Sequence, residues 1–169
     1  MIRSISFWLA AALVVVADQY TKHLVSTTFE PGESRIVVPH VLWLTYVQNV
    51  HGAFGLFGSR PWLLIVMAVA VLAVFWFSFR DSAARSRLVR IAFGAIVGGA
   101  IGNIIDRVHY QYVVDFFDLR WWTVFNVADS CITVGVCLLV LSTLVHERRI
   151  ARTKPALLAT DATPTEPLA

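Results

Sequence analysis

The sequence predicts an all-α membrane protein with four transmembrane helices and short strands outside the bilayer. Three observations lead to this fold class. The 169 residues are 57% hydrophobic and only 15% charged, whereas a soluble domain is about one-quarter charged. Four apolar segments approach the length that a spanning helix needs. The basic residues gather at the ends of these segments without interleaved aromatics, which indicates membrane topology and argues against a nucleic-acid-binding surface.

The first apolar segment, at about 5–25, is predicted to be an uncleaved spanning helix, because no small-x-small cleavage site follows it. Asp18 and Lys22 lie four residues apart near its outer end and share a face. Two interpretations of this pair remain open. It is either a modest ion pair at the membrane interface or a support for a site beneath it.

Residues 26–60 have a different character. Pro31-Gly32 is a turn signal, and 35–38 and 41–47 are rich in β-branched and aromatic residues, which predicts short strands outside the bilayer. A glycine-punctuated apolar loop follows at 48–58. It lacks the Gly-Lys-Ser/Thr ending of a phosphate-binding loop, so we expect a pliable apolar platform at the membrane surface.

Two further spans are predicted at 61–79 and at about 88–105. The first is 19 uncharged residues, or about 28 Å of helix, which nearly matches the hydrocarbon thickness. The second is rich in glycine, which predicts close helix packing. It ends in three polar residues. Asn103 and Arg107 share a helical face, while Asp106 lies on the neighbouring one.

A short connection at 108–122 carries Trp121-Trp122, a pair typical of interfacial anchors. The fourth span is predicted at about 123–145. Residues 1–154 are expected to form a single integral-membrane domain. The Ala-, Thr- and Pro-rich segment 155–169 is expected to be a disordered tail.

The positive-inside rule orients the chain. Four basic residues lie in 80–90 and four in 146–154, whereas the other two connections between spans carry two arginines each. With four spans, both termini are therefore expected in the cytoplasm. The predicted strands and Asp115 are then expected outside.

Two carboxylates are the strongest candidates for catalysis. Asp129 lies just inside the apolar fourth span, and Asp115 precedes that span on the same side. Carboxylates at such positions usually face a bundle interior or a wet cavity. Two of them held about 3–5 Å apart share one proton at neutral pH. The charged partner can then activate water while the neutral partner donates to a peptide carbonyl. The pattern predicts an aspartyl hydrolase, although spacing alone also allows structural roles.

Two neighbouring residues bear on this dyad. Asn126 lies three residues before Asp129 on the same helical face, so its amide is expected to orient that carboxylate. Asp118 competes with Asp115, but on an extended segment it faces away from it. Asp115 is therefore the preferred member.

Other chemistries fit the sequence less well. His146-Glu147 lacks the second histidine of a zinc protease helix, and no Gly-x-Ser-x-Gly elbow is present. Lys22 and Ser26 have the spacing of a Ser–Lys pair, but Ser26 is expected past the helix end. Cys131 and Cys137 form no zinc or disulfide pattern and are expected to pack as small apolar residues. A small transporter or scaffold with a proton relay remains the main alternative.

The sequence resembles the lipoprotein signal peptidases (signal peptidase II) in four blocks that occur in the family's order. These are Asp18-Gln19-Tyr20-Thr21-Lys22, Gly98-Gly99-Ala100-Ile101-Gly102-Asn103-Ile104-Ile105-Asp106-Arg107, Val113-Val114-Asp115-Phe116 and Phe125-Asn126-Val127-Ala128-Asp129-Ser130.

The resemblance implies that Asp115 and Asp129 are the catalytic aspartates. It implies a lining and supporting set of Asp18, Asn49, Asn103, Arg107 and Asn126, and the same blocks place Lys22 and Asp106 in that set. The family's fold has four transmembrane helices, a small extracytoplasmic β-cradle and a mobile outer helix.

The resemblance also implies an activity and a location. The family cleaves bacterial prolipoproteins immediately before a diacylglyceryl-modified cysteine, uses no metal or other cofactor and is blocked by globomycin-type cyclic depsipeptides. We therefore expect a monomer in the bacterial plasma (inner) membrane, in contact with lipid and prolipoprotein. Its active site is expected near the outer leaflet. One departure is His51, which stands where the family's Asn-x-Gly-Ala block, beginning here at Asn49, usually has glycine. It puts the local loop geometry in question.

Overall fold

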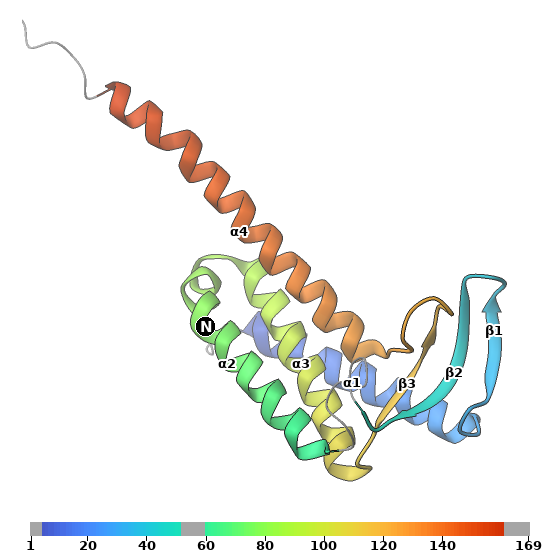
Figure 1. Ribbon diagram of the computed structural model, residues 1–169. Coiled ribbons are helices and arrows are strands. Elements are labelled where there is room, and N and C mark those ends of the chain that lie inside the picture. The colour runs from blue at the N-terminus through green and yellow to red at the C-terminus, as the bar shows by residue number, and fades with distance from the viewer. Residues whose placement is uncertain (1–4, 52–59, 161–169) are drawn as a thin grey trace, which may run out of the picture.

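The computed structural model describes residues 5–51 and 60–160 (Figure 1). Within them, a bundle of helices carries a small antiparallel sheet at one end. The helices are α1 (Ile5–Thr28), α2 (Pro61–Arg85), α3 (Arg87–His109) and α4 (Val127–Thr160). The strands are β1 (Ser34–Val38), β2 (Leu42–Asn49) and β3 (Val113–Asp118), in the spatial order β1-β2-β3.

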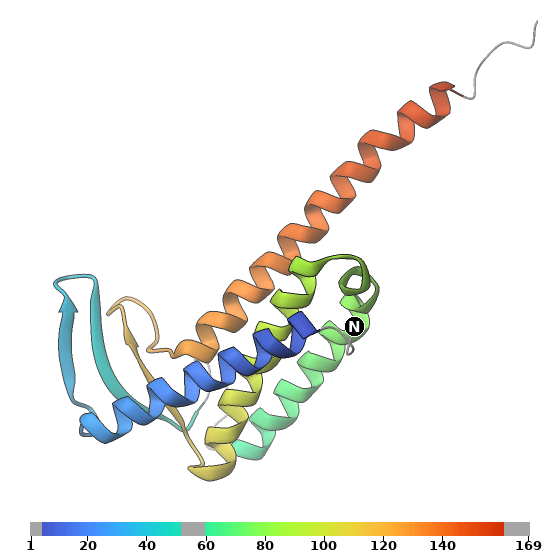
Figure 2. The same cartoon turned by 180° about the vertical axis from the view of Figure 1, so that it is seen from behind.

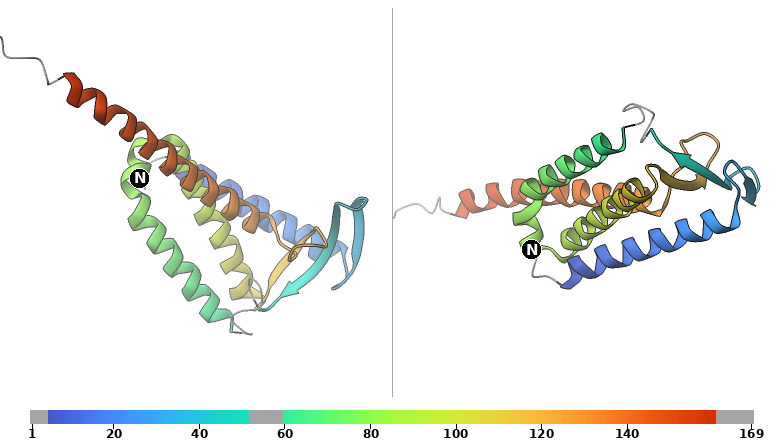
Figure 3. Two further views of the ribbon diagram at one scale, coloured as in Figure 1. Left: turned by 45° about the horizontal axis from the view of Figure 1, so that its top comes forward. Right: turned by 90° about the horizontal axis from the view of Figure 1, so that it is seen from below.

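The central helix is α3, which packs against α1, α2 and α4, and Figure 3 shows it between α1 and α2. Glycines allow this close approach, as predicted. The positions of Gly94 and Gly98 face the backbone of α1, and that of Gly99 faces Ala128 of α4. A methyl group at any of the three would overlap backbone atoms of the neighbouring helix.

Two apolar clusters hold the fold together. The first lies among the helices and includes Phe7, Phe93 and Leu139. The second joins the end of α1 to the sheet through Val25 and Phe116, and Figure 2 shows α1 reaching the sheet. The sheet is therefore fixed to the bundle at the end where α3 stops and α4 begins.

Three of the described helices contain segments long and apolar enough to cross a membrane: Trp62–Phe79, Arg87–His109 and Val127–Val145. These correspond to the second, third and fourth predicted spans. The first predicted span, α1, is 24 residues long but is not among them. The polar residues of its C-terminal half lower its hydropathy. Of the four predicted spans, three are thus supported by the length and composition of the described helices.

The strands agree closely with the sequence. Those predicted at 35–38 and 41–47 are β1 and β2, which pair antiparallel. The segment containing Asp115 is extended, as expected, and forms β3 beside β2, with Asp115 opposite Val47. The strand β2 runs on to Asn49 and so brings that residue next to Val113.

The ends of α4 differ from the prediction. The helix begins at Val127, not at 123, because Phe125 forms a β-bridge with Phe117 and Asn126 caps the first turn. At the other end the helix continues to Thr160. Residues 155–160, expected in the tail, are therefore helical, in keeping with the helix-favouring alanines and leucines among them. The remaining tail, 161–169, lies outside the described residues.

The predicted glycine-punctuated loop falls mostly on residues 52–59, which lie outside the described part of the chain. No helix is described between β2 and α2. The outer helix implied by the resemblance is therefore not assigned to any described segment.

Candidate active site

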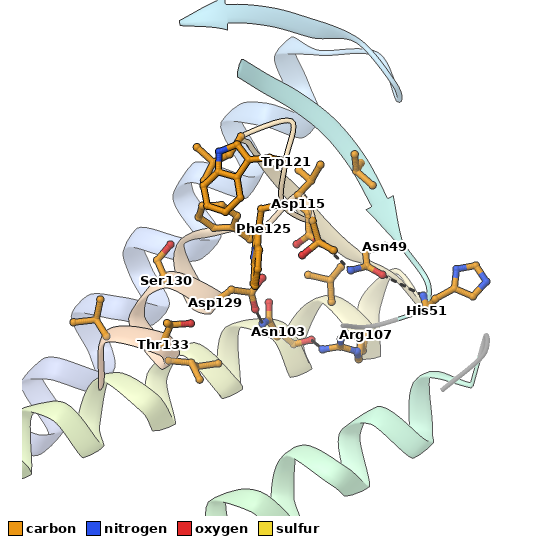
Figure 4. Close-up of a pocket in the computed structure, with 18 residues that line it drawn as sticks. Asn49, His51, Asn103, Arg107, Asp115, Trp121, Phe125, Asp129, Ser130 and Thr133 are labelled. Atoms are coloured by element: carbon orange, nitrogen blue, oxygen red, sulfur yellow. Dashed lines mark hydrogen bonds between the residues drawn. The ribbon is translucent and has the colours of Figure 1, made fainter. Parts of the chain in front are cut away.

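A pocket of about 920 Å³ opens where β3, the connection before α4, the C-terminal part of α3 and the first turns of α4 meet (Figure 4). Both predicted catalytic aspartates line it. The other polar lining residues are Asn49, His51, Asn103, Arg107, Thr123, Ser130 and Thr133. The remaining wall is apolar and consists of Val47, Val113, Leu119, Trp121, Trp122, Val124, Phe125, Ile132 and Val134.

Asp115 is buried and held by two amides. Asn49 Nδ2 donates to its Oδ2 at 2.8 Å, and Asn126 Nδ2 donates to its Oδ1 at 2.7 Å. Burial and then the charge of Asp129 raise the pKa of Asp115 to about 7. The two amide hydrogen bonds and the charge of Lys22 oppose this shift. Asp115 therefore holds a proton over much of the range in which an ordinary aspartate is ionised.

Asp129 lies in the first turn of α4 and caps it together with Asn126. The backbone N–H of Asp129 donates to Asn126 Oδ1 at 2.9 Å, and the backbone N–H of Asn126 donates back to Asp129 Oδ2 at 3.3 Å. This reciprocal pair is a capping box. Asn103 Nδ2 donates to the other oxygen, Asp129 Oδ1, at 2.8 Å. The carboxylate is thus held at the positive end of the helix dipole.

Asn126 contacts both aspartates, but its role differs from the expected one. The side-chain amide was expected to orient Asp129, yet it donates to Asp115 and to Asn103 Oδ1, at 2.7 and 3.1 Å. The cause is the capping box, which occupies Asn126 Oδ1 and turns Nδ2 the other way. Asn126 is fully buried and links the two aspartates.

The Asp18–Lys22 pair is buried rather than exposed. Lys22 Nζ lies 2.8 Å from Asp18 Oδ2 and 2.9 Å from Asp106 Oδ2. The interpretation as a modest pair at the interface is therefore wrong, because α3 covers both side chains. Gln19, which we did not single out, donates to Asp106 Oδ1 at 2.9 Å and to the Gly102 carbonyl at 3.2 Å. In the sequence, Gln19 stood out only as the neighbour of Asp18 in the first block that resembles the family.

Arg107 reaches the pocket from the C-terminal part of α3. Its Nη1 donates to the Asn103 carbonyl at 3.2 Å, whereas its buried Nε has no protein partner. Arg107 lines the pocket with Asn103, while Asp106 does not, in agreement with the predicted helical faces.

Asp118 lies outside the pocket, as the strand alternation predicted. Thr45 Oγ1 donates to its Oδ2 at 2.8 Å, and the Arg120 amide donates to its Oδ1 at 2.8 Å. Asp118 therefore ties β2 to the turn after β3. It is a structural residue of the sheet.

The alternative Ser–Lys pair, Ser26 with Lys22, is not formed in the structure. Ser26 Oγ donates to the His23 carbonyl at 3.1 Å, and Lys22 Nζ is engaged by other residues. Among the described residues, no cluster of His, Cys, Asp or Glu is arranged to hold a metal ion. His51 is exposed, and its ring points away from Asp115 (Figure 4).

Several pocket residues were not predicted as site residues. Trp121 and Trp122 were interpreted only as interfacial anchors, yet both line the pocket. Ser130 and Thr133 also line it, one helical turn apart along α4. Thr133 lies four residues after Asp129 and so on the same helical face, and Ser130 ends the block that resembles the family's second aspartate motif.

Comparisons with known proteins find relatives over most of the chain. Residues 10–145 match the family model described as signal peptidase (SPase) II. The lipoprotein signal peptidase of Syntrophomonas wolfei is 44% identical over 147 residues, which cover 86% of this chain and 97% of the relative. That of Moorella thermoacetica is 41% identical over 133 residues, covering 79% and 89%.

Two solved structures of bacterial membrane enzymes, both obtained by the in meso method, are also similar. The one at 2.3 Å resolution has a TM-score of 0.75 and 29% identity, covering 95% of this chain and 93% of that one. The one at 1.9 Å resolution has a TM-score of 0.71 and 34% identity, covering 80% and 90%.

Proposed function

The chain belongs to the signal peptidase II family, the lipoprotein signal peptidases, and we propose that it cleaves prolipoproteins with an aspartate dyad, Asp115 and Asp129. Signal peptidase II processes prolipoproteins, so the peptidase activity and the substrate class follow from membership. The observation that carries the aspartyl mechanism is that both carboxylates line one pocket and are both bound by Asn126. Asp18, Lys22, Asn49, Asn103, Asp106, Arg107 and Asn126 are proposed to support them.

The two aspartates take different parts. Asp115 is the proton-bearing member, because burial and the neighbouring charge raise its pKa to about 7. Asp129 is the ionised member, because the N-terminus of α4 favours a negative charge there. The pair titrates as one unit.

The chemical steps follow from this division. Asp129 takes a proton from a water molecule, and the water oxygen forms a bond to the scissile carbonyl carbon. Asp115 gives its proton to the carbonyl oxygen, which yields a neutral tetrahedral diol. Collapse of the diol returns a proton to Asp115, and the leaving nitrogen takes the proton held by Asp129 as the C–N bond breaks. Both aspartates end in their starting states.

The pocket suits a lipidated peptide. Its wall is largely apolar, which fits acyl chains beside the diacylglyceryl-modified cysteine that follows the cleaved bond. A helical signal peptide satisfies its own backbone groups and must unwind to be cut. Asn49 and Arg107 line the pocket and are proposed to bind the backbone groups that unwinding frees.

We further propose that α1 is a fourth span, which completes the predicted topology. Its 24 residues correspond to about 36 Å of helix, and its polar residues Asp18 and Lys22 face α3 rather than lipid. Both termini would then be cytoplasmic, with the sheet and the dyad near the outer leaflet of the bacterial plasma membrane. The domain would comprise 1–154 and act as a monomer open to globomycin-type inhibitors.

The test uses the protein purified in detergent and a lipidated prolipoprotein, with release of the signal peptide as the readout. Asp115→Asn and Asp129→Asn should each lower kcat by about 10²–10⁴-fold while substrate binding is kept. Asp118→Asn is the matched control on the same strand and should retain activity. A globomycin-type compound should block the wild type.

Wild-type cleavage by either dyad variant would overturn the proposed mechanism. A transporter or scaffold with a proton relay, the alternative from the sequence, would release no signal peptide even as the wild type. Transporters also place their sites near the membrane midplane, whereas both aspartates here lie where the helices meet the sheet.

A further inference from the structure

Lys22 is the centre of a buried polar network that lies behind the pocket. Its side chain is 4% exposed, so its three N–H donors need protein partners. It has three: Asp18 Oδ2 at 2.8 Å, Asp106 Oδ2 at 2.9 Å and Asn103 Oδ1 at 2.9 Å. These acceptors belong to α1 and α3, and Lys22 does not line the pocket.

Two of the three partners extend to the backbone beside the dyad. Asp18 Oδ1 accepts from the amide of Ala128 at 2.9 Å, one residue before Asp129. Asp106 Oδ2 accepts from the amide of Val114 at 3.1 Å, one residue before Asp115. Each carboxylate that neutralises Lys22 therefore also holds the chain next to one of the aspartates.

The third partner reaches the dyad directly. Lys22 Nζ is only a donor, so it requires the oxygen of the Asn103 side chain to face it. The amide nitrogen of Asn103 must then point the other way, where it donates to Asp129 Oδ1 at 2.8 Å. The ammonium group, together with Asn126 Nδ2, which donates to the same oxygen at 3.1 Å, thus determines which way this amide is turned.

We propose that Lys22 is a positioning residue for the reaction, setting the places of Asp115 and Asp129 through Asp106, Asp18 and Asn103. This inference rests on the proposed function of the dyad. A single ammonium group, which does not line the pocket, thereby acts on a β-strand and on a helix that carry the two reacting groups.

Lys22 also acts on the dyad through its charge. Its positive charge lowers the pKa of Asp115 against the effects of burial and of Asp129. The charged groups that act on the dyad are Asp18 and Lys22 from α1 and Arg107 from α3. Asp106 of α3 pairs with Lys22 behind them. Removing the ammonium should therefore raise the pKa of Asp115 and move the pH profile of cleavage to higher pH.

The experiment compares Lys22→Met with the wild type in detergent, using a lipidated prolipoprotein and full kinetics. The expected result is a fall in kcat of about 10²-fold, the usual cost of displaced reacting groups, with little change in KM. The pH profile should also shift upwards. Arg35→Met is the control: it removes a cation from an exposed pair with Glu33 and should change neither quantity.

A second variant covers the case in which Lys22→Met does not fold. The double substitution Asp18→Asn/Lys22→Met removes one negative and one positive charge, so the network keeps its net charge. The side-chain oxygen that remains at position 18 can still accept from the Ala128 amide. The same fall in kcat is expected, with a smaller upward shift of the pH profile, because losing the negative charge of Asp18 offsets part of the effect of losing the positive charge of Lys22.

Wild-type kcat and pH profile in either folded variant would overturn the proposal. Failure of both variants to fold would also overturn it, since Lys22 would then serve the fold rather than the dyad.

Asp115→Asn, measured alongside, separates this proposal from the proposed function. Retained activity in Asp115→Asn would refute the aspartate dyad itself. Lost activity in Asp115→Asn together with wild-type behaviour in Lys22→Met would refute only the positioning role.

Discussion

The burial of Asp115 serves the proposed chemistry and lowers stability at neutral pH. Burial raises the pKa of its carboxyl from about 3.8 to about 7, so between these values the folded protein binds a proton that the unfolded chain releases. Stability therefore falls as pH rises through this window and changes no further above it. An asparagine at this position carries no such proton.

Asp115→Asn should therefore gain thermal stability relative to the wild type as pH rises from about 4 to about 8. Thermal unfolding in detergent at both pH values measures this difference. Gly94→Ala, which introduces no titrating group, should differ from the wild type by the same amount at both. An equal difference for Asp115→Asn at both pH values would contradict the prediction.

Arg107 lines the pocket and is proposed to bind backbone groups of the substrate. Its Nε has no protein partner, and a hydrogen bond from a charged group is worth about 1.5–3 kcal/mol. Arg107→Ala should therefore raise KM by about tenfold or more. Arg120→Ala is the control, because Arg120 lies over Trp43 on the sheet, outside the pocket. Unchanged rate and affinity in Arg107→Ala would show that the substrate backbone does not bind there.

At the level of single residues, the sequence pointed to most of the site. The two aspartates, Asn49, Asn103 and Arg107 were predicted, and all five line the pocket. The contacts among them were harder to foresee. Asp18 accepts a hydrogen bond from the backbone N–H of Ala128, 110 residues away. The direction of the Asn126 side-chain amide follows from the cap of α4, and the start of that helix was predicted a few residues too early.

Among the elements, the α1–α3 contact controls the network most directly. A methyl group on Gly102 would overlap the Asp18 carboxylate, which holds Lys22 and the first turn of α4. The glycine is thus required by a polar contact as well as by close helix packing.

Gly102→Ala should lower both stability and the kcat of the folded enzyme. Gly94→Ala crowds the same helix interface beside Phe7, far from the network. It should lower stability and leave kcat unchanged. Unfolding midpoints and kcat of both variants test this. An equal effect of the two variants on kcat would indicate that helix spacing, and not Asp18, governs the site.

Helices and strands were predicted well because apolar length and β-branched composition are local signals. The start of α4 was misplaced because the apolar run continues through Phe125, which in the structure pairs with Phe117. The sequence does contain the correcting signal, since Asn126 and Asp129 have the spacing of a capping box. The pairing of β3 with β2 joins residues 64 to 75 positions apart in the sequence, and no local pattern specifies it.

At the scale of the whole molecule, the arginine distribution and the shape of the fold together predict an orientation in the membrane. The sheet lies at one end of the bundle, and α4 extends beyond the other helices at the opposite end (Figure 1). The distribution of arginines predicts that the sheet lies outside. Glu33, between α1 and β1, and Arg87, at the start of α3, mark the two sides.

Cysteine labelling in cells tests this orientation. In a background with Cys131 and Cys137 replaced by alanine, Glu33→Cys should react with a membrane-impermeant thiol reagent in intact spheroplasts. Arg87→Cys should react only after the membrane is opened. The reverse pattern would invert the topology.

The buried pair on α1 also has a consequence for biogenesis. As the proposed fourth span, α1 would enter the membrane before Asn103 and Asp106 have been synthesised. Asp18 and Lys22, one turn apart and 2.8 Å from each other, can neutralise one another during that interval, when lone charges in lipid are expensive. A nascent fragment ending at Arg60 should therefore integrate with both residues present and do so poorly with Lys22→Met.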